Sequence, residues 1–454
     1  LGYPPAQFRL SRAYRLGEGV GVDFQVSLDW LVKAGNGGLA EAQLTLGEAF
    51  ETRKYYGIQD NIQSFHWYSR AARQGVEDAL RRSQIGTYWM LEAIPTTSKK
   101  ELGAIFERLK LEAEGGDRHA QYNVALIYHK GNRGKPDLNL AAKYMRLAAD
   151  QGDYRAQFNL GLYYLNGYGV ERDLAMATKY TKLAAEQGLP DAQLTLAMFF
   201  ESGTGVTMDQ SEAVKYLLMA AAQGDGRAHF DLAKKYHQGV GVKQDLVEAG
   251  KYWRLAADRG HAMAQLMLAR CYLIGEGVEK NLDLSVKYLR LAVDQGESEA
   301  QYNMGLYYCM GYGVEKDMAQ AAHYWRLAAG QGDPVAQFNL ALCYAHGNGV
   351  PKDLTQAVKY YRLAANQGHL ESLNNLGDAY EKGLGVKKDL AWALKYWTLA
   401  ADQGLVVAQR NLGVRYLHGE GVKKNPRLAR KYFLMAAAQG DLESGEYLET
   451  IDSV

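Results

Sequence analysis

Cysteine and proline are scarce in this sequence, with three and eight residues among 454. The cysteines, Cys271, Cys309 and Cys343, lie 38 and 34 residues apart. An odd number at such intervals is no disulfide framework and does not match the spacing of zinc ligands. We therefore expect the cysteines to be small buried hydrophobes.

The sequence also has neither an excess of one charge nor a long apolar run. The 52 Lys and Arg residues balance 51 Asp and Glu residues, for a net charge of +1. A nucleic-acid-binding protein needs a basic bias or stripe, so we expect no nucleic-acid partner. No apolar run reaches the roughly 18 residues of a membrane-spanning helix, so we expect no membrane span.

The first residues match the middle of a repeated pattern. Residues 1–8, LGYPPAQF, resemble residues 331–338, QGDPVAQF. The residues shown begin without an initiator methionine and contain no signal peptide. We expect a processed or trimmed chain, which leaves room upstream for an export signal, an anchor or a catalytic domain.

Glycine, by contrast, is abundant, and its 49 residues recur at fixed offsets. One glycine series follows an interval of 36 residues from 152 to 440, and one tyrosine series follows it from 144 to 432. The shared pattern reads A-Q-x-N-L-G-x-x-Y-x-x-G-x-G-V-x-x-D-x-x-x-A-x-K-Y-x-x-L-A-A-x-Q-G. Such an array grows by stacking units rather than by enlarging one core.

Two helices fit into each unit, separated by the G-x-G-V loop. An aspartate or asparagine precedes each second helix, where these residue types are favoured as N-caps. Because one helix pair cannot bury its apolar side alone, the sequence predicts an all-α protein, an α/α solenoid. The buried stripes are expected at Ala156, Leu160 and Tyr164 in the first helix and at Ala177, Tyr180 and Ala184 in the second. The expected N-caps are Asp137, Asp173, Asp209, Asp245, Asn281, Asp317, Asp353, Asp389 and Asn425.

The pattern resembles the Sel-1-like repeat family, a relative of the tetratricopeptide repeats. The resemblance covers at least residues 120–440 in nine copies. It implies a right-handed superhelical solenoid of about twelve helix-turn-helix repeats. It also implies a non-enzymatic adaptor for protein partners, in a bacterial periplasmic or secreted setting, with the cytoplasm left open.

Four segments are expected along the chain. Residues 1–75 hold two repeats, of which the second is degenerate because ETRKYYGIQDN replaces the glycine loop. Residues 76–116 form an irregular helix-loop-helix unit with Pro95 as its breaker. Residues 117–440 hold nine regular repeats, and residues 441–454 form a C-terminal cap or partial repeat.

Nothing in the sequence indicates an active site, a metal or a cofactor. An enzyme needs an individual constellation of residues, whereas a repeat places the same residue every 36 positions. The ten histidines are scattered and form no H-x-x-x-H motif. The G-x-G-V loop lacks the third glycine and the preceding strand of a dinucleotide site. We therefore expect a non-catalytic protein without cofactors.

The first helices have a second side that carries apolar residues. If each unit is numbered from the alanine of its A-Q pair, positions 1, 5 and 9 face the core, and positions 3 and 7 face away. In a tetratricopeptide-like stack, as the resemblance implies, that side lines a concave groove. Its apolar residues either bind a partner or pack between neighbouring first helices. The candidate groove residues are Tyr122, Leu126, Phe158, Leu162, Leu194, Met198, Phe230, Lys234, Arg270, Tyr302, Leu306, Phe338 and Leu342.

A row of asparagines at position 4 is unusual, because asparagine is a mediocre helix former. Either the amides bind the backbone of an extended peptide, or each bridges to the neighbouring repeat. The asparagines are Asn123, Asn159, Asn303, Asn339, Asn375 and Asn411.

Three functions are consistent with these patterns. The first is a scaffold that binds a protein or peptide on the concave face. The second is an element whose outer surface assembles or spaces an envelope or secreted complex. The third is an accessory to glycan processing. A homo-oligomer is also left open.

Overall fold

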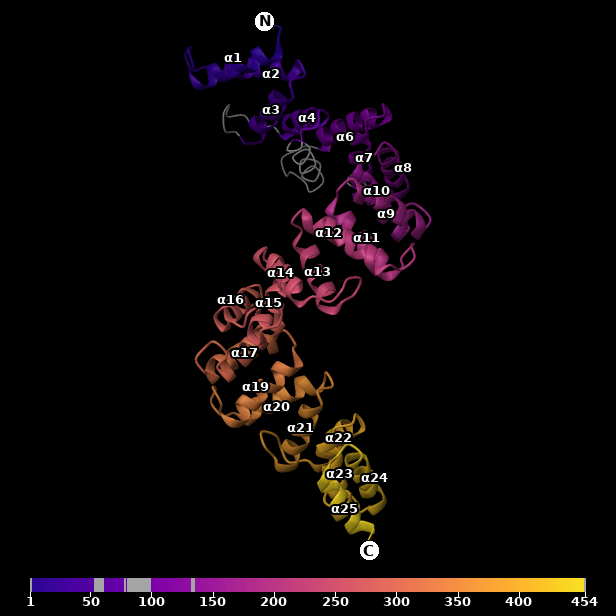
Figure 1. The fold of residues 1–454 in the computed structure, drawn as a ribbon, viewed down its shortest axis with the longest axis vertical. Coiled ribbons are helices and arrows are strands. Elements are labelled where there is room, and N and C mark those ends of the chain that lie inside the picture. The colour runs from indigo at the N-terminus through magenta and orange to yellow at the C-terminus, as the bar shows by residue number, and fades with distance from the viewer. Residues whose placement is uncertain (1, 53–60, 77–78, 80–98, 132–134, 453–454) are drawn as a thin grey trace. The chain divides into compact units, whose positions relative to one another are not determined.

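The computed structural model describes residues 2–52, 61–76, 79, 99–131 and 135–452, and all regular secondary structure in these ranges is helical (Figure 1). The helices follow one another in pairs, as the repeat predicts. This confirms the all-α class and the paired-helix architecture of a solenoid. The altered loop at 53–60 and the breaker Pro95 lie outside the described residues.

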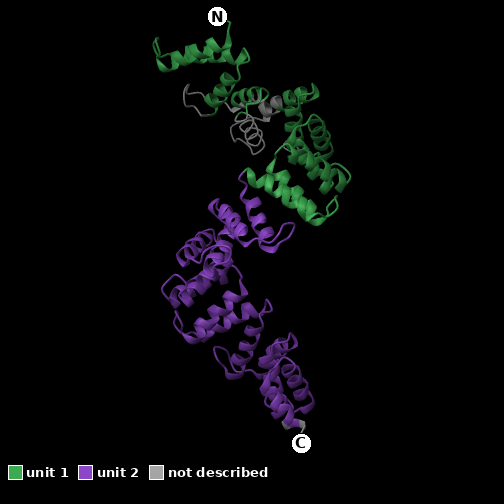
Figure 2. Cartoon of the chain, viewed as in Figure 1, with its two compact units in different colours: residues 1–223 green, residues 224–454 purple. Residues whose placement is uncertain are grey.

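The chain divides into two compact units, residues 1–223 and residues 224–454 (Figure 2). The first unit contains α1 (Pro4–Leu16), α2 (Phe24–Asn36), α3 (Ala40–Thr52), α4 (Asn61–Ala72), α6 (Lys99–Glu114), α7 (Arg118–Lys130), α8 (Leu138–Asp150), α9 (Tyr154–Asn166), α10 (Leu174–Glu186), α11 (Pro190–Ser202) and α12 (Gln210–Ala222). The second contains α13 (Gly226–Gln238), α14 (Leu246–Asp258), α15 (Ala262–Ile274), α16 (Leu282–Asp294), α17 (Ser298–Met310), α18 (Met318–Gly330), α19 (Pro334–His346), α20 (Leu354–Ala365), α21 (Leu370–Lys382), α22 (Leu390–Asp402), α23 (Val406–His418), α24 (Pro426–Ala437) and α25 (Leu442–Asp452).

The pair α9 and α10 shows how one unit forms. Asp173 caps α10, since its side chain accepts a hydrogen bond from the amide of Met176. All nine N-cap residues expected before second helices, from Asp137 to Asn425, accept such a bond. Each cap contributes about 1 kcal/mol, so the array starts its second helices at fixed positions.

The buried stripes are confirmed as well. In α9, Ala156, Leu160 and Tyr164 are 0%, 0% and 8% exposed, and the stripe of α10 is buried in the same way. The ring of Tyr164 stacks on that of Tyr180 with centroids 5.9 Å apart. An aromatic stack of this kind recurs in all nine regular repeats, at 5.5–6.0 Å. The tyrosine series therefore joins the two helices of each unit.

The two glutamines of the repeat form a clasp that joins three helices. The Nε2 group of Gln157 donates to the carbonyl of Ala149 at 3.2 Å, at the end of the preceding second helix. Its Oε1 atom accepts a hydrogen bond at 2.7 Å from Nε2 of Gln187, which follows α10. The same clasp recurs at Gln43–Gln74, Gln121–Gln151, Gln193–Gln223, Gln265–Gln295, Gln337–Gln367 and Gln409–Gln439.

Replacing Gln157 with alanine should cost about 2 kcal/mol of unfolding free energy, because two hydrogen bonds are lost. The Ala149 carbonyl keeps its bond from the Gly152 amide, whereas the Gln187 amide loses its bond to Gln157. Replacing Gln187 alone should cost about 1 kcal/mol, since the bond to Ala149 survives. Urea unfolding of both single variants and the double variant measures the coupling. If the two losses simply add, the glutamines do not act as one clasp.

Candidate functional site

In the first unit, the candidate groove residues lie on α7, α9 and α11, and their exposure differs by position. At position 3, Tyr122 and Leu194 are each only 9% exposed. At position 7, Leu162 is half-buried and Met198 is 63% exposed. The expectation that position 3 faces water is therefore wrong for Tyr122 and Leu194, while position 7 reaches the surface.

The following repeat covers the rings at position 3. The guanidinium of Arg155, in the first turn of α9, lies 4.7 Å from the ring centroid of Tyr122. In the second unit, His261 stacks on Phe230 at 4.4 Å, and His369 lies 4.7 Å from Phe338. Leu266, at the same position, is 4% exposed. Packing against the following repeat thus accounts for much of position 3, while partner binding at the remaining residues of this position stays a prediction.

Two of the asparagines at position 4 also reach the preceding repeat. Asn159 Nδ2 donates to the hydroxyl of Tyr122 at 3.2 Å. Asn411 Nδ2 donates to Oδ1 of Asn374 at 3.3 Å. These two side chains bridge repeats, whereas a peptide-binding role for Asn123, Asn303, Asn339 and Asn375 stays a prediction.

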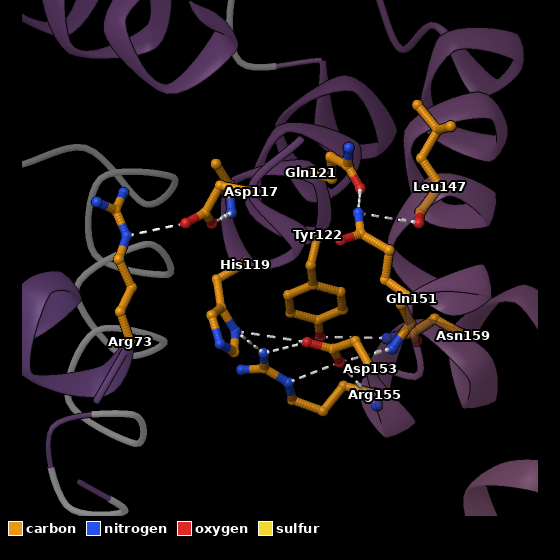
Figure 3. A network of polar contacts seen from close by, with 12 residues as sticks. Arg73, Asp117, His119, Gln121, Tyr122, Leu147, Gln151, Asp153, Arg155 and Asn159 are labelled. Carbon is orange, nitrogen blue, oxygen red and sulfur yellow. Dashed lines mark hydrogen bonds and ion pairs between the residues drawn. The ribbon is translucent and has the colours of Figure 1, made fainter. Parts of the chain in front are cut away.

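A buried ion pair supports this side of the first unit, between α7 and α9 (Figure 3). Arg155 donates to both carboxylate oxygens of Asp153, at 3.0 and 2.5 Å. The two side chains are only 10% and 2% exposed. Arg155 also lies 2.9 Å from Nδ1 of His119. The arrangement fixes Arg155 over Tyr122 and so fixes the spacing of the two first helices.

The charge of Asp153 is stabilised strongly by these partners. Burial by itself would raise the pKa of its carboxyl. Hydrogen bonds with His119 and Arg155, together with the Arg155 charge, outweigh burial and hold this pKa well below its usual range. The pair is therefore ionised at neutral pH, and Asp153 has no proton to exchange in acid–base chemistry.

In the second unit, position 7 is cationic in α13 and α15 and apolar in α17 and α19. Lys234 of α13 and Arg270 of α15 are exposed, while Leu306 of α17 and Leu342 of α19 are half-buried. The Lys234 ammonium lies 5.7 Å from the ring centroid of Phe230. Arg270 lies 3.9 Å from a carboxylate oxygen of Glu276. Two cations thus adjoin an apolar stretch on one side of the first helices.

Sequence reasoning missed position 11, one helical turn beyond position 7. Ile274 and Met310 lie there and are 57% and 58% exposed. Residues four apart share one helix side, so positions 3, 7 and 11 form a single line. The sequence could have indicated these residues, because apolar residues at position 11 extend the row that was predicted from positions 3 and 7.

The repeat signature is matched by a known family model. The model described as Sel1 repeat matches residues 4–39, 40–76, 118–153, 155–189, 190–225, 226–261, 262–297, 298–333, 334–369, 370–405 and 406–441. The chain belongs to the Sel1 repeat family. Proteins built from Sel1 repeats generally mediate interactions between proteins, and enzymatic activity is not typical of the repeat.

Two solved structures of Sel1 repeat proteins resemble this chain. A protective antigen from uropathogenic Escherichia coli with an SLR fold is 29% identical, with a TM-score of 0.74. That match covers 100% of this chain and 88% of the antigen. A Sel1 repeat protein from Oxalobacter formigenes is 29% identical, with a TM-score of 0.58, over 72% of this chain and 92% of its own. No curated protein matches the sequence.

The titratable groups of this Sel1 repeat chain form no catalytic constellation in the part that the structure describes. Burial raises the pKa of the Cys271 and Cys343 thiols to about 11, which makes them poor nucleophiles at neutral pH. Cys309 is half-buried rather than buried. Among the described residues, no cluster of His, Cys, Asp and Glu has the geometry of a metal site. No described helix has the length and apolar character needed to span a bilayer.

Proposed function

We propose that this Sel1 repeat chain is a non-catalytic scaffold that binds a protein or peptide along positions 7 and 11 of its first helices. The observation that carries this proposal is the exposure of Ile274 and Met310 in the second unit, 57% and 58%, on one side of the first helices α15 and α17. Exposed methionines are adaptable and are common on surfaces that bind other proteins. Family membership supports the same kind of role.

The second unit suggests the chemistry of the partner. Lys234 and Arg270 favour acidic side chains, and the neighbouring Met310 and half-buried Leu306 favour apolar ones. A segment that combines carboxylates with large apolar residues would satisfy both parts of the row. On this proposal, the residues at position 3 support the surface from below rather than contact the partner.

The test is a pull-down with chemical crosslinking, followed by affinity measurement with the purified partner. Ile274→Asp together with Met310→Asp should weaken binding by at least about thirtyfold, the effect of losing a central contact. The matched control is Met208→Asp together with Val247→Asp, since these side chains are 64% and 56% exposed but do not belong to the first helices.

Equal helicity of both variants is required before binding is compared. If both bind as the parent chain does, the partner does not use the first helices, and the alternative of assembly through the outer surface is favoured. If the control loses binding equally, any added charge is harmful and positions 7 and 11 are not the site.

A further inference from the structure

A strongly basic edge lies in the last two regular repeats, although the chain as a whole is nearly neutral. Residues 382–395 and 419–431 together contain nine Lys and Arg residues and only two carboxylates, against a net charge of +1 for the whole chain. Two consecutive loops read GVKKD and GVKKN. Their lysines, Lys387, Lys388, Lys423 and Lys424, are all exposed. We call these four residues the lysine edge.

The two loops of the lysine edge lie next to each other. A Cβ atom placed on Gly421, in the second loop, would lie 3.2 Å from Cδ1 of Leu390. Leu390 is the first residue of α22 and follows the first loop directly. The helices α22 and α24 both begin at these loops, so the positive ends of their dipoles add to the lysine charges.

The carboxylates near the lysine edge are already engaged elsewhere. Asp389 caps α22 by accepting hydrogen bonds from the amides of Ala391 and Trp392. Glu420 pairs with Arg415. Within the described ranges, no ion pair involves any of the four lysines. Their charge is therefore available to an external anion.

Apolar side chains accompany this charge. Leu384 and Leu390 are 42% and 37% exposed, and Trp392 is 41% exposed. Trp392 stands on the first turn of α22, with the Lys395 ammonium 4.2 Å from its ring centroid. Of the nine regular repeats, this one alone carries tryptophan at that position. Indole and leucine side chains beside lysines favour the boundary between lipid headgroups and acyl chains.

We propose that the lysine edge docks on an anionic phospholipid surface, with Trp392 and Leu390 entering the headgroup region. A protein partner fits less well, because protein interfaces are depleted in lysine and enriched in arginine. Clusters of four to eight basic residues, by contrast, are typical of sites that recognise anionic lipids, at about 1 kcal/mol for each charge.

The test is co-sedimentation of the full chain with vesicles of phosphatidylcholine, with and without about 30 mol% phosphatidylglycerol. Binding should require the anionic lipid and should fall as the salt concentration rises. Changing Lys387, Lys388, Lys423 and Lys424 to glutamine should weaken binding by about a hundredfold or more. The matched control changes four exposed loop lysines of other repeats to glutamine: Lys135, Lys243, Lys280 and Lys316.

A second variant separates docking from simple charge attraction. Brominated lipids should quench the fluorescence of Trp392, and this quenching should be lost in Trp392→Tyr while the vesicles still bind. Equal loss in both lysine variants would overturn the proposal, because net charge alone would then explain binding. Failure to bind anionic vesicles would overturn it too, as would tighter binding of the lysine edge to single-stranded DNA or an acidic peptide than to the vesicles.

Discussion

Replacing Gly349 with alanine is expected to lower the free energy of unfolding by about 3–5 kcal/mol, near the upper limit for a single substitution. Gly349 is the second glycine of its loop and has φ of +71°. A Cβ atom there would lie 1.9 Å from the carbonyl oxygen of Met318, the first residue of the preceding second helix α18. Because the obstacle is backbone, the loop or the helix must move.

The matched control is Gly332→Ala in the same repeat region. Gly332 also has positive φ, +97°, but a Cβ atom there meets nothing within 4 Å. Only the backbone strain applies, so a loss of about 1–2 kcal/mol is expected. Urea unfolding followed by circular dichroism compares the two variants. Similar losses would mean that the close approach of the loop to α18 contributes little to stability.

Replacing Asp153 with asparagine is expected to cost about 3–5 kcal/mol, because the Arg155 guanidinium then becomes an uncompensated buried charge. The control is Asp225→Asn, two repeats later. Asp225 and Arg227 form the same pair at the same positions, but the Arg227 side chain is 59% exposed and that of Arg155 only 10%. Water can solvate Arg227, so this variant should lose no more than about 1 kcal/mol.

The difference between Asp153→Asn and the parent chain should depend on pH. The pKa of Asp153 is lowered in the folded state, so the contribution of its charge is complete above the unfolded value of about 4. It is lost as the pH falls further towards the folded value. The stability difference measured by urea unfolding should therefore be full at about pH 6 and smaller at about pH 3. A difference that does not change over this range would show that the carboxylate charge is not its cause.

Local features of the fold could be predicted from the sequence. The glycine and tyrosine series predicted the length of the repeat unit. The aspartates before the second helices predicted where those helices begin. The spacing of Ala156, Leu160 and Tyr164 predicted which side of the first helix is buried. Each of these depends on helix periodicity and on residues within one unit, which a sequence pattern records directly.

Contacts between units were harder to predict. Met198 and Tyr122 belong to the same predicted apolar row. Only the folded structure shows that Arg155 of the next repeat covers Tyr122, whereas Met198 stays exposed. The glutamines recur in the sequence, but the hydrogen bond between them joins residues 30 positions apart. The sequence pattern does not show this contact, because it forms only when the helix pair is folded.

The sequence by itself determined that this protein is an array of helix pairs with capped second helices and buried alanine, leucine and tyrosine stripes. The tertiary structure alone decided which copies of a repeated residue are buried and which are exposed. Asp153–Arg155 and Asp225–Arg227 occupy identical positions, and only the first pair is enclosed. The physical reason is that burial depends on the side chains of the adjacent repeat, which the periodic pattern of one repeat does not contain.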